Sequence, residues 1–476
     1  MRQRGAPFIA GLVLLAGLVG CRATTPVVEP PVAPPTSFTE SGTAAVGGRW
    51  WEGFGDAELN RLMTEALDRN FSLRSAWDRL NQADARRRSA GASLWPSLDA
   101  RAGSEYAWTQ ARTDSGPDIR SSRRQSIGLA AEYELDLWGR LRASRQAASL
   151  DQAVSAEDLR TAAITLSSTL VSTWFELVEQ RGQLDLLTNQ TNINQKTLGL
   201  LEQRLALGQS ESTDVLQQRQ LVESRREDSH RAEARVRALE LELAVLLGRP
   251  SDRADFPTTG TLAALPPLPP TGAPSELLQQ RPDVRAAFLS VQAADQRVAA
   301  AVADRYPRVS LVASYDTSSG RFSSLFDNWV ASFGGNLAAP ILDGGARKAE
   351  VARTRAVASE RLNNYGQRIV EALAEVETAL SDEARFREVV QSIESQLATA
   401  KDVRERTLSR YLSGTETYLR VLDAQLSEQA LERELLSARL DLLLARVQLC
   451  RALAGGWEMT PPATEPTPKN QYPLPL

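Results

Sequence analysis

The feature that most constrains the fold of this chain is a long proline-free run that one glycine interrupts. The run extends from Gly139 to Gly248 and is broken at Gly208. Proline costs about 3 kcal/mol inside a helix, so its absence permits very long helices. A continuous helix from Gly139 to Leu207 would be about 100 Å long at about 1.5 Å per residue. The run therefore predicts a long helical hairpin with Gly208 at its tip, where glycine suits a left-handed backbone.

The same pattern occurs a second time. Gly345 opens another proline-free run, and Gly414 breaks it at the spacing found in the first run. Upstream of the two runs, Trp95-Pro96-Ser97 aligns with Tyr306-Pro307-Arg308. A duplication of this length indicates that the chain contains two copies of one structural unit.

Three proline-rich segments separate these copies from each other and from the two ends of the chain. Such segments are typical of extended tethers and linkers. We expect the following order: a signal peptide at 1–20, a lipid-anchored tether at 21–49, a first repeat at 50–250 with a β-hairpin at 97–137, a linker at 251–274, a second repeat at 275–457 with a β-hairpin at 307–341, and a tail at 458–476.

The N-terminal segment has the features of a bacterial lipoprotein signal. Arg2 and Arg4 precede an apolar run that is too short to span a membrane comfortably. Its end, Leu18-Val19-Gly20-Cys21, resembles a lipobox. That resemblance implies cleavage before Cys21, which would then carry a diacylglycerol and an N-acyl chain, enough to anchor the protein stably. The alternative is an ordinary signal peptide with an incidental cysteine.

After Pro96 the periodicity changes from about 3.6 residues to two. Apolar and polar residues alternate at 97–108 and 127–137, and again at 309–315 and 329–341. We expect the stretches 109–124 and 316–328 to be loops. Strands with one apolar and one polar face are typical of a transmembrane β-barrel, and four strands are too few to close one. Several chains would therefore share one barrel; hairpins packed on a soluble core are the alternative.

Composition excludes several other functions. The net charge of −4 argues against a general nucleic-acid surface. His230 is the sole histidine, which makes histidine catalysis and multi-histidine metal sites improbable. No nucleophile, base and orienting group cluster around it, so we expect no enzyme activity and no cofactor other than the lipid on Cys21.

Taken in order along the chain, these motifs resemble the TolC-like outer-membrane efflux proteins, and most of all their lipoprotein OprM/NodT branch. The whole mature chain takes part in the resemblance. The residues that carry it are Leu18 to Cys21, Trp50-Trp51, Leu135 to Arg140, Arg281-Pro282-Asp283, Asp343-Gly344-Gly345, Gly208 to Leu216 and Gly414 to Leu422.

The resemblance implies a mixed α and β membrane protein that forms a homotrimer. Four strands from each chain would build a twelve-stranded β-barrel, which continues into a long periplasmic α-helical barrel with a mixed equatorial belt. The trimer would lie in the cell outer membrane and extend into the periplasm. It would act as the exit duct of a tripartite efflux system, receiving small molecules from an inner-membrane pump of the RND type through a periplasmic adaptor. The alternatives are an exit duct for type I protein secretion and, further away, a structural envelope lipoprotein without a pore.

A channel of this kind would have a charged lumen. Five acidic residues fall on the polar strand face that we assign to it: Asp99, Glu105, Glu132, Glu134 and Asp136. Threefold repetition would turn them into acidic rings, which favour cations and disfavour anions. The alternative is that these carboxylates only keep a water-filled lumen wet.

The resemblance also places a gate and an adaptor contact at the periplasmic tips, which Gly208 and Gly414 mark. Asp423 matches an acidic position that the family carries after the second tip. This chain departs from the family at Arg420, which occupies a second acidic position, and at Glu416, which replaces a basic residue.

Asp214 and Tyr411 match a pair that can hydrogen-bond across neighbouring coils. We therefore hypothesise a gate that Arg420–Asp423 and Asp214–Tyr411 contacts hold closed. The alternative is that Arg420 is an exposed helix residue without a gating role.

Overall fold

The fold is taken from a computed structural model, which describes residues 31–42, 48–114, 116–251, 256, 259–455, 457 and 459. The signal peptide, Cys21 and residues 460–476 of the tail lie outside the described residues. So do residues 21–30 and 43–47 of the tether, and the predictions made for these segments remain predictions.

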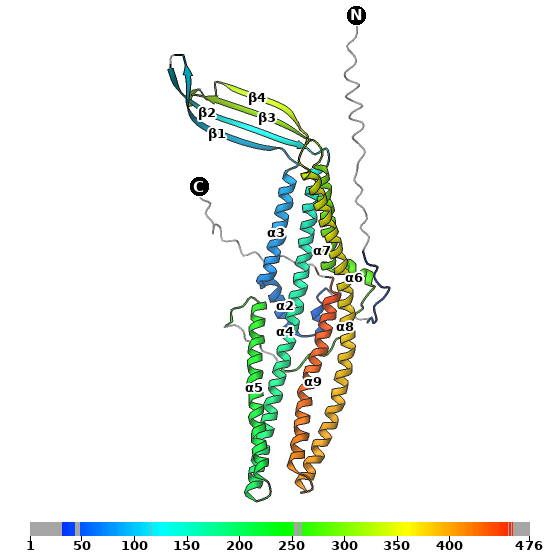
Figure 1. Ribbon diagram of the computed structural model, residues 1–476. Coiled ribbons are helices and arrows are strands. Elements are labelled where there is room, and N and C mark those ends of the chain that lie inside the picture. The colour runs from blue at the N-terminus through cyan, green and yellow to red at the C-terminus, as the bar shows by residue number, and fades with distance from the viewer. Residues whose placement is uncertain are drawn as a thin grey trace.

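The protein is a long shaft of helices that carries a four-stranded sheet at one end (Figure 1). Short 3₁₀ turns lie at Trp50–Phe54 and Phe322–Ser324. The α-helices are α2 (Ala57–Arg69), α3 (Phe71–Ala92), α4 (Arg140–Ala206), α5 (Ser212–Leu246), α6 (Pro274–Gln280), α7 (Pro282–Ala303), α8 (Ala346–Leu412) and α9 (Tyr418–Leu453). The strands are β1 (Ser97–Thr113), β2 (Gly116–Leu135), β3 (Arg308–Ser319) and β4 (Trp329–Ala338).

Both predicted helical hairpins are present. α4 and α8 each run unbroken for 67 residues, and α5 and α9 return beside them. The two tips turn at Gly208 and Gly414, whose φ angles are +71° and +77°. Such angles are readily adopted only by glycine, which is why the helices break there and not at a neighbouring residue. The prediction of paired tips from the glycine spacing is confirmed.

The two repeats are interleaved and do not form separate domains. α4 of the first repeat packs against α7 and α9 of the second, as well as against α3 and α5. α8 packs against α7 and α9. Near the sheet the shaft therefore consists of α3, α4, α7 and α8, and farther away it consists of the two hairpins (Figure 1). Among the described residues, no helix is both long enough and apolar enough to cross a membrane.

The sheet is antiparallel throughout, in the order β1-β2-β3-β4. Its register places the predicted apolar residues in common rows, such as Leu98, Ala131, Ala313 and Phe333. Residues that pair directly share a face of the sheet. The alternation predicted from the sequence is therefore the alternation of the two faces.

The prediction that 109–124 forms a loop was wrong. β1 and β2 continue as a regular hairpin up to the pair Thr113 and Gly116, well beyond the ends of β3 and β4 (Figure 1). The prediction failed because the loss of apolar residues was read as the end of the strands. A hairpin can continue without an apolar face, since its turn fixes the register and its backbone groups pair regardless of the side chains. The connection after β3 is likewise shorter than expected, because β3 extends to Ser319.

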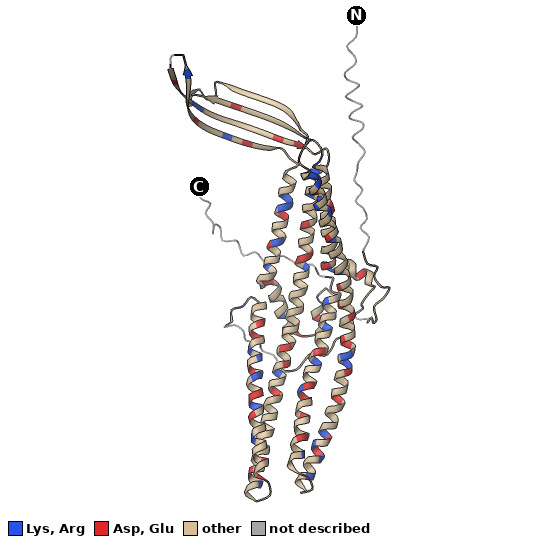
Figure 2. Cartoon of the chain, viewed as in Figure 1, with Lys and Arg blue, Asp and Glu red and all other residues tan. Residues whose placement is uncertain are grey.

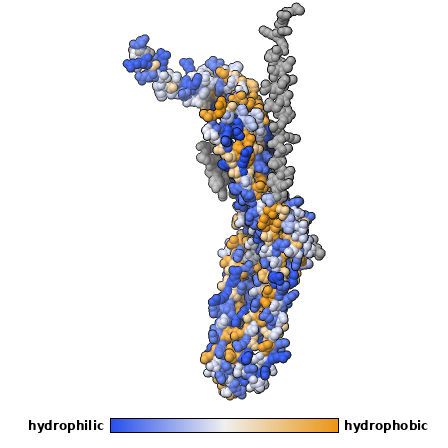
Figure 3. Space-filling model, turned by 45° about the vertical axis from the view of Figure 1, so that its right-hand side comes forward, coloured by the Kyte–Doolittle hydropathy of each residue, from blue (hydrophilic) through white to orange (hydrophobic). Residues whose placement is uncertain are grey.

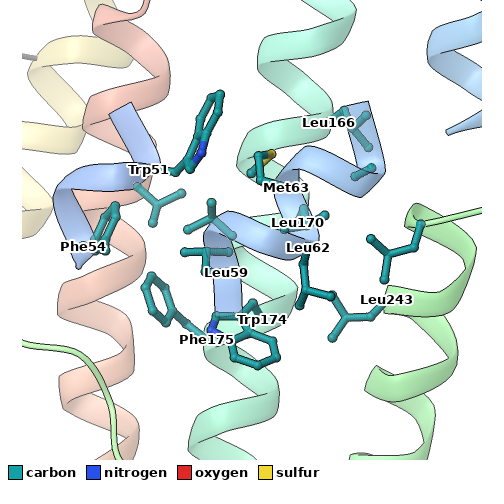
Figure 4. Packing of buried hydrophobic residues seen from close by; sticks show 14 of the residues in the cluster. Trp51, Phe54, Leu59, Leu62, Met63, Leu166, Leu170, Trp174, Phe175 and Leu243 are labelled. Atoms are coloured by element: carbon teal, nitrogen blue, oxygen red, sulfur yellow. The ribbon is translucent and has the colours of Figure 1, made fainter. Parts of the chain in front are cut away.

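The largest apolar core lies midway along the shaft, where α2 and the turn Trp50–Phe54 pack on α4 and α9. Asp56 caps α2, accepting hydrogen bonds from the backbone nitrogens of Glu58 and Leu59 at 2.9 and 3.0 Å. Its second oxygen accepts the indole N–H of Trp174 at 2.7 Å. Figure 4 shows Trp174 and Phe175 of α4 directed into this cluster. The belt between the two halves of the shaft is therefore a packed core.

Candidate functional site

The polar face of the sheet carries four of the five acidic residues predicted there. Asp99 pairs with Ala130 and Glu105 pairs with Arg124, and both rows share a face with Glu132 and Glu134. Asp99, Glu105 and Glu132 are exposed. The predicted grouping of these four carboxylates on one face agrees with the register, and the opposite face is the apolar one.

The expectation for the fifth acidic residue, Asp136, was wrong. β2 ends at Leu135, and the Asp136 carboxylate instead accepts hydrogen bonds from the backbone nitrogens of Leu141 and Arg142 at 3.0 and 2.9 Å. These are free N–H groups of the first turn of α4, whose positive dipole end favours a carboxylate. Asp136 is a helix cap, a role that the chain needs because Gly139 cannot cap with a side chain.

Basic residues on the same polar face offset part of the acidic charge. Arg140 binds the Glu134 carboxylate, with Nη2 at 2.7 Å from Oε2. Arg101 belongs to the row that also holds Gly128 and Asp316, and Arg124 lies across from Glu105. Figure 2 shows blue and red residues intermixed along the strands. This face of the sheet is therefore polar and carries both signs of charge.

The two helical tips pack against each other through a small apolar cluster of Leu201, Val215, Leu221, Tyr411, Tyr418, Val421 and Leu422. At its centre the rings of Tyr411 and Tyr418 meet edge to face, with 5.6 Å between their centroids. The Arg204 guanidinium lies 4.9 Å from the centroid of the Tyr411 ring, a cation–π contact. Residues from both hairpins thus meet next to the two glycine turns.

The structure places the predicted gate residues on these tips but does not join them within one chain. Arg420 and Asp423 are exposed, and neither forms an ion pair with another described residue. The Glu416 carboxylate accepts the backbone nitrogen of Thr417 at 3.1 Å. The Arg420–Asp423 contact of the gate hypothesis is therefore not formed inside a single chain.

The second predicted contact is not formed inside the chain either. The Asp214 carboxylate accepts the hydroxyl of Ser210 at 3.0 Å and the backbone nitrogen of Glu211 at 3.4 Å, which caps α5. The hydroxyl of Tyr411 is buried and has no hydrogen-bond partner among the described residues. A buried hydroxyl without a partner is costly, so Tyr411 has a free donor for a group outside this chain.

Above the tips, buried polar side chains connect the two hairpins. We call this set the tip seam; it consists of Gln183, Gln190, Asn194, Gln218, Tyr418, Gln425 and Gln429. Asn194 is its centre, since its side-chain oxygen accepts the amides of Gln425 at 2.6 Å and Gln429 at 3.3 Å. Its backbone oxygen accepts the amide of Gln218 at 2.7 Å. One α4 residue thus connects to both α5 and α9.

The seam continues on both sides of Asn194. Towards the tip, the hydroxyl of Tyr418 donates to Gln218 Oε1 at 2.6 Å. Burial raises the pKa of this hydroxyl, and the nearby Tyr411 and Asp214 raise it further, so it remains a donor. Towards the sheet, the amide of Gln190 donates to the backbone oxygen of Gln429 at 3.2 Å. Polar contacts therefore follow the α4–α9 interface over several turns.

A cavity of about 210 Å³ lies beside the seam, lined in part by Gln190, Tyr411, Tyr418, Gln425 and Gln429. Some buried polar atoms here have no partner among the described residues: Tyr411 Oη, Asn194 Nδ2 and Gln429 Oε1. Apolar residues such as Leu200, Leu201 and Leu408 complete the lining of the cavity, so water can bind only beside the polar groups, since each water needs two to four polar partners. The polar atoms without a partner thus mark the places in this interface where water can bind.

The tip seam is not among the features predicted from the sequence. Apolar residues at heptad spacing on α4, such as Leu170 and Leu177, are fully buried, and this stripe ends near Leu184, which is half-buried. The signal that could have located the seam is the heptad spacing of Gln183 and Gln190 on the same proline-free run. Amides at such positions are easily taken for solvent-exposed residues.

The described residues contain no group of three or more histidine, cysteine, aspartate or glutamate side chains placed to bind a metal ion. Cys450 is a free thiol in the equatorial core, and burial raises its pKa to about 12. It is therefore a packing residue with little thiolate character. His230 is exposed on α5, with Nδ1 at 3.3 Å from Glu233 Oε2.

Comparison with known proteins agrees with this architecture. The profile of the family described as outer membrane efflux protein matches residues 62–249 and 273–455. The pyoverdine export outer membrane protein OpmQ of Pseudomonas aeruginosa is 32% identical over 429 residues, which cover 86% of this chain and 88% of the relative. The outer membrane protein OprJ of the same organism is 31% identical over 470 residues, which cover 96% and 97%.

The fold agrees with solved structures as well. The outer-membrane channel OprN superposes with a TM-score of 0.81 at 27% identity, over 90% of this chain and 99% of that one. Channels with this fold are trimers that combine a β-barrel with an α-helical barrel, and they work with adaptors and inner-membrane pumps. The four strands and two helical hairpins described above are one chain's share of such a channel. The chain therefore belongs to the outer membrane efflux protein family and is an outer-membrane efflux channel whose helices extend into the periplasm.

Proposed function

We propose that this chain is the lipid-anchored exit duct of an RND-type tripartite pump, and that the duct opens at the hairpin tips. The tip seam is the observation that carries the proposal. Near the tips, α9 is joined to α4 and α5 by hydrogen bonds that water can replace, next to a small apolar cluster and a cavity. At the equator the same helices are joined by apolar packing. The hairpin of α8 and α9 can therefore swing at the tip while its other end stays fixed.

We propose small molecules as the cargo, with selection made by the pump. Relatives of this chain are named for pyoverdine export, cation efflux and toluene efflux. Such different cargoes share one fold, which argues that the duct itself is permissive. The mixed charge of the strand wall is consistent with a wetted passage of low selectivity. Export of proteins by a type I system remains the alternative.

The tips have the properties of a docking surface for a periplasmic adaptor. Four leucines around the two turns are more than half exposed: Leu207, Leu216, Leu412 and Leu419. Exposed apolar side chains grouped on a water-facing tip mark an interaction site. Gly208 and Gly414 have no heavy atom within 4 Å of where a β-carbon would lie, so a partner can approach the backbone there.

The gate hypothesis becomes a proposal about contacts between copies in the trimer. Arg420 and Asp423 form no ion pair with the described residues of their own chain, so each can pair with the neighbouring copy. Tyr411 likewise has a free hydroxyl for the Asp214 of another copy. The closed-state conductance of Arg420→Ala in planar bilayers tests this, with Arg406→Ala on α8 as an exposed control. A raised closed-state current for Arg420→Ala alone is expected, whereas an unchanged current would refute the ionic gate.

The lipid anchor on Cys21 is proposed from the sequence motif alone. Incorporation of labelled palmitate tests it, because Cys21→Ser should abolish the label while the wild-type chain retains it. A label that persists in Cys21→Ser would contradict the anchor and leave the channel proposal untouched.

The experiment that tests the function is a susceptibility panel of drugs, dyes, bile salts, organic solvents and metal salts. A deletion strain is complemented with wild type or with the double variant Gly208→Pro, Gly414→Pro. Proline fixes φ near −65°, so it cannot adopt the positive φ of either turn. Rescue by wild type but not by the variant, at equal amounts of trimer in the outer membrane, is the expected result. Absence of any sensitivity, together with loss of a secreted protein, would favour type I export instead.

A further inference from the structure

We propose that the outer end of the sheet binds a phosphorylated glycolipid headgroup of the outer leaflet through Arg123 of β2 and Arg321, just after β3. The proposal rests on the outer-membrane location of the chain and is independent of how the gate works or what the pump carries. The first hairpin, formed by β1 and β2, reaches well beyond the other two strands.

The apolar face of the sheet fixes the height of the membrane. It includes Leu98 near the periplasmic end of β1 and Trp108 ten positions further along (108 − 98). Ten residues of strand span about 34 Å at about 3.4 Å per residue. A strand tilt of about 40° reduces this to about 26 Å, close to the height of about 25 Å for the apolar band of such barrels. Trp108 therefore lies at the outer membrane–water interface.

Aromatic residues at this level agree with an interface. The rings of Tyr106 and Trp108 meet edge to face with 4.5 Å between their centroids, and both are largely exposed on the apolar face. Phe322 and Phe326 of the β3–β4 connection are also largely exposed. Girdles of aromatic side chains mark the interfaces of transmembrane barrels. The hairpin beyond Trp108 then stands outside the membrane, and its free end is hydrophilic (Figure 3).

At this level Arg123 lies on the lipid-facing side, and Arg321 lies in the connection beside it. Arg123 pairs directly with Tyr106, so the two side chains share the apolar face of the ribbon. The β3–β4 connection runs beside β2 here, since a β-carbon at Gly320 would lie 3.4 Å from the carbonyl oxygen of Arg123. Arg321 follows Gly320 directly. The two arginines are therefore close in space and next to the aromatic girdle.

Neither arginine has an acidic partner among the described residues. Both are exposed, and no carboxylate of the described chain lies within ion-pair distance of either guanidinium. By contrast, Arg120 of the same hairpin binds Asp118 at 2.8 Å. Basic residues (blue in Figure 2) recur at the free end of the β1–β2 hairpin. Two unpaired guanidinium groups beside aromatic rings at a membrane interface match a phosphate on a lipid, which arginine binds with two parallel hydrogen bonds.

The isolated position of the hairpin adds a second argument. β2 pairs with β3 only up to Gln125, so the residues from Gly116 to Arg124 pair with β1 alone. A two-stranded ribbon is marginally stable by itself in water. Contact with a headgroup on its lipid-facing side would hold this ribbon at the membrane surface.

The test uses the purified full-length trimer in detergent. It is titrated with bis-phosphorylated lipid A or with the fully dephosphorylated lipid, and native mass spectrometry measures the fraction bound. We expect wild type to bind the phosphorylated lipid at least tenfold more tightly, with binding weakened at high salt. The double variant Arg123→Gln, Arg321→Gln should lose this preference, since each lost guanidinium–phosphate contact weakens binding about tenfold or more.

The matched control is Arg120→Gln, Arg124→Gln, which removes the same charge from the opposite face of the same hairpin. It should keep the preference for the phosphorylated lipid. Equal loss in both double variants would overturn the site and leave only a general charge effect. No preference in the wild type would refute the proposal outright. Arg321→Gln alone lies outside the strands, so it provides the measurement if the double variant does not assemble.

Discussion

The contacts between the two hairpins change in chemistry along the shaft, from a large apolar core at the equator to hydrogen-bonded amides beside a small apolar cluster near the tips. At the equator, α4 and α9 join through Leu170, Trp174, Leu443 and Val447, all nearly inaccessible to water. At the tip seam the same helices join through amides centred on Asn194. Apolar packing is lost when its surfaces separate, whereas a hydrogen bond lost to the partner can be replaced by one to water. This difference supports the proposal that the duct opens at the hairpin tips while the equatorial ends of the helices stay fixed.

At the level of the equator, a buried ion pair joins the two helices of the second hairpin. Arg446 of α9 is 1% exposed and Glu383 of α8 is 2% exposed, and Arg446 Nη2 lies 2.6 Å from Glu383 Oε1. The same guanidinium donates to the carbonyl oxygens of Pro266 and Pro267, the latter at 2.8 Å. One arginine thus fixes two helices and the proline-rich linker to one another. The described residues of the tip seam form no buried ion pair, since they are amides and a tyrosine.

The largest expected effect is therefore that of Arg446→Met. Removal of one partner from a buried ion pair leaves the Glu383 charge uncompensated and costs about 3–5 kcal/mol. Thermal unfolding of the trimer, followed by circular dichroism, should show a clear drop in midpoint. Arg439→Met is the matched control, because Arg439 joins the same two helices through Glu394 in an exposed pair. Exposed pairs contribute about 0–1 kcal/mol, so similar losses in both variants would contradict the comparison.

Asn194→Ala should have an effect of intermediate size, and it should change channel opening more than thermal stability. It leaves the side-chain amides of Gln425 and Gln429 without their common acceptor, at a cost of about 1–3 kcal/mol. Because the cost falls at the tip seam alone, we expect a higher open probability in planar bilayers with little change in the unfolding midpoint. Asn192→Ala, an exposed neighbour on α4, is the control. A large loss of thermal stability without any change in conductance would show that the seam is a structural contact only.

The smallest effect separates the two tyrosines of the tip. Tyr418→Phe removes the hydrogen bond to Gln218 and should favour opening by about 1 kcal/mol. Tyr411→Phe removes a buried hydroxyl that has no hydrogen-bond partner among the described residues, so within a single chain it should not weaken the closed tip. Closed-state conductance of the two variants compares them directly. If Tyr411→Phe proves as leaky as Tyr418→Phe, the hydroxyl is engaged by a neighbouring copy, as the proposed Asp214–Tyr411 contact requires.

Much of the fold could be predicted because its signals are local. The turns at Gly208 and Gly414 need a positive φ, and proline-free runs between them permit helices of 67 residues. The two faces of the strands follow from a period of two, which the register bears out at Leu98, Ala131 and Ala313. These features depend on neighbours along the chain, so the sequence alone contains them.

The candidate site was predicted less completely, for a physical reason. Asp136 looked like a strand residue because alternation continued through it, yet the free N–H groups of α4 draw its carboxylate into a cap. The long hairpin beyond Trp108 lacks the apolar alternation that marked the other strands. Neither partner belongs to the local sequence pattern: Asp136 binds the first turn of α4, and the outer part of β2 pairs with β1.

The elements, their duplication and the two faces of the strands follow from the sequence, because helix breaks and side-chain periodicity are properties of nearby residues. The packed helices alone show which buried polar groups meet: Asn194 with Gln425, Arg446 with Glu383, and Tyr411 with no hydrogen-bond partner among the described residues. Amides and guanidinium groups are read as solvent-exposed until the fold removes water from them. Whether such a group then stabilises a contact or leaves it free to open depends on partners more than fifty residues away, which only the packed helices bring within hydrogen-bond distance.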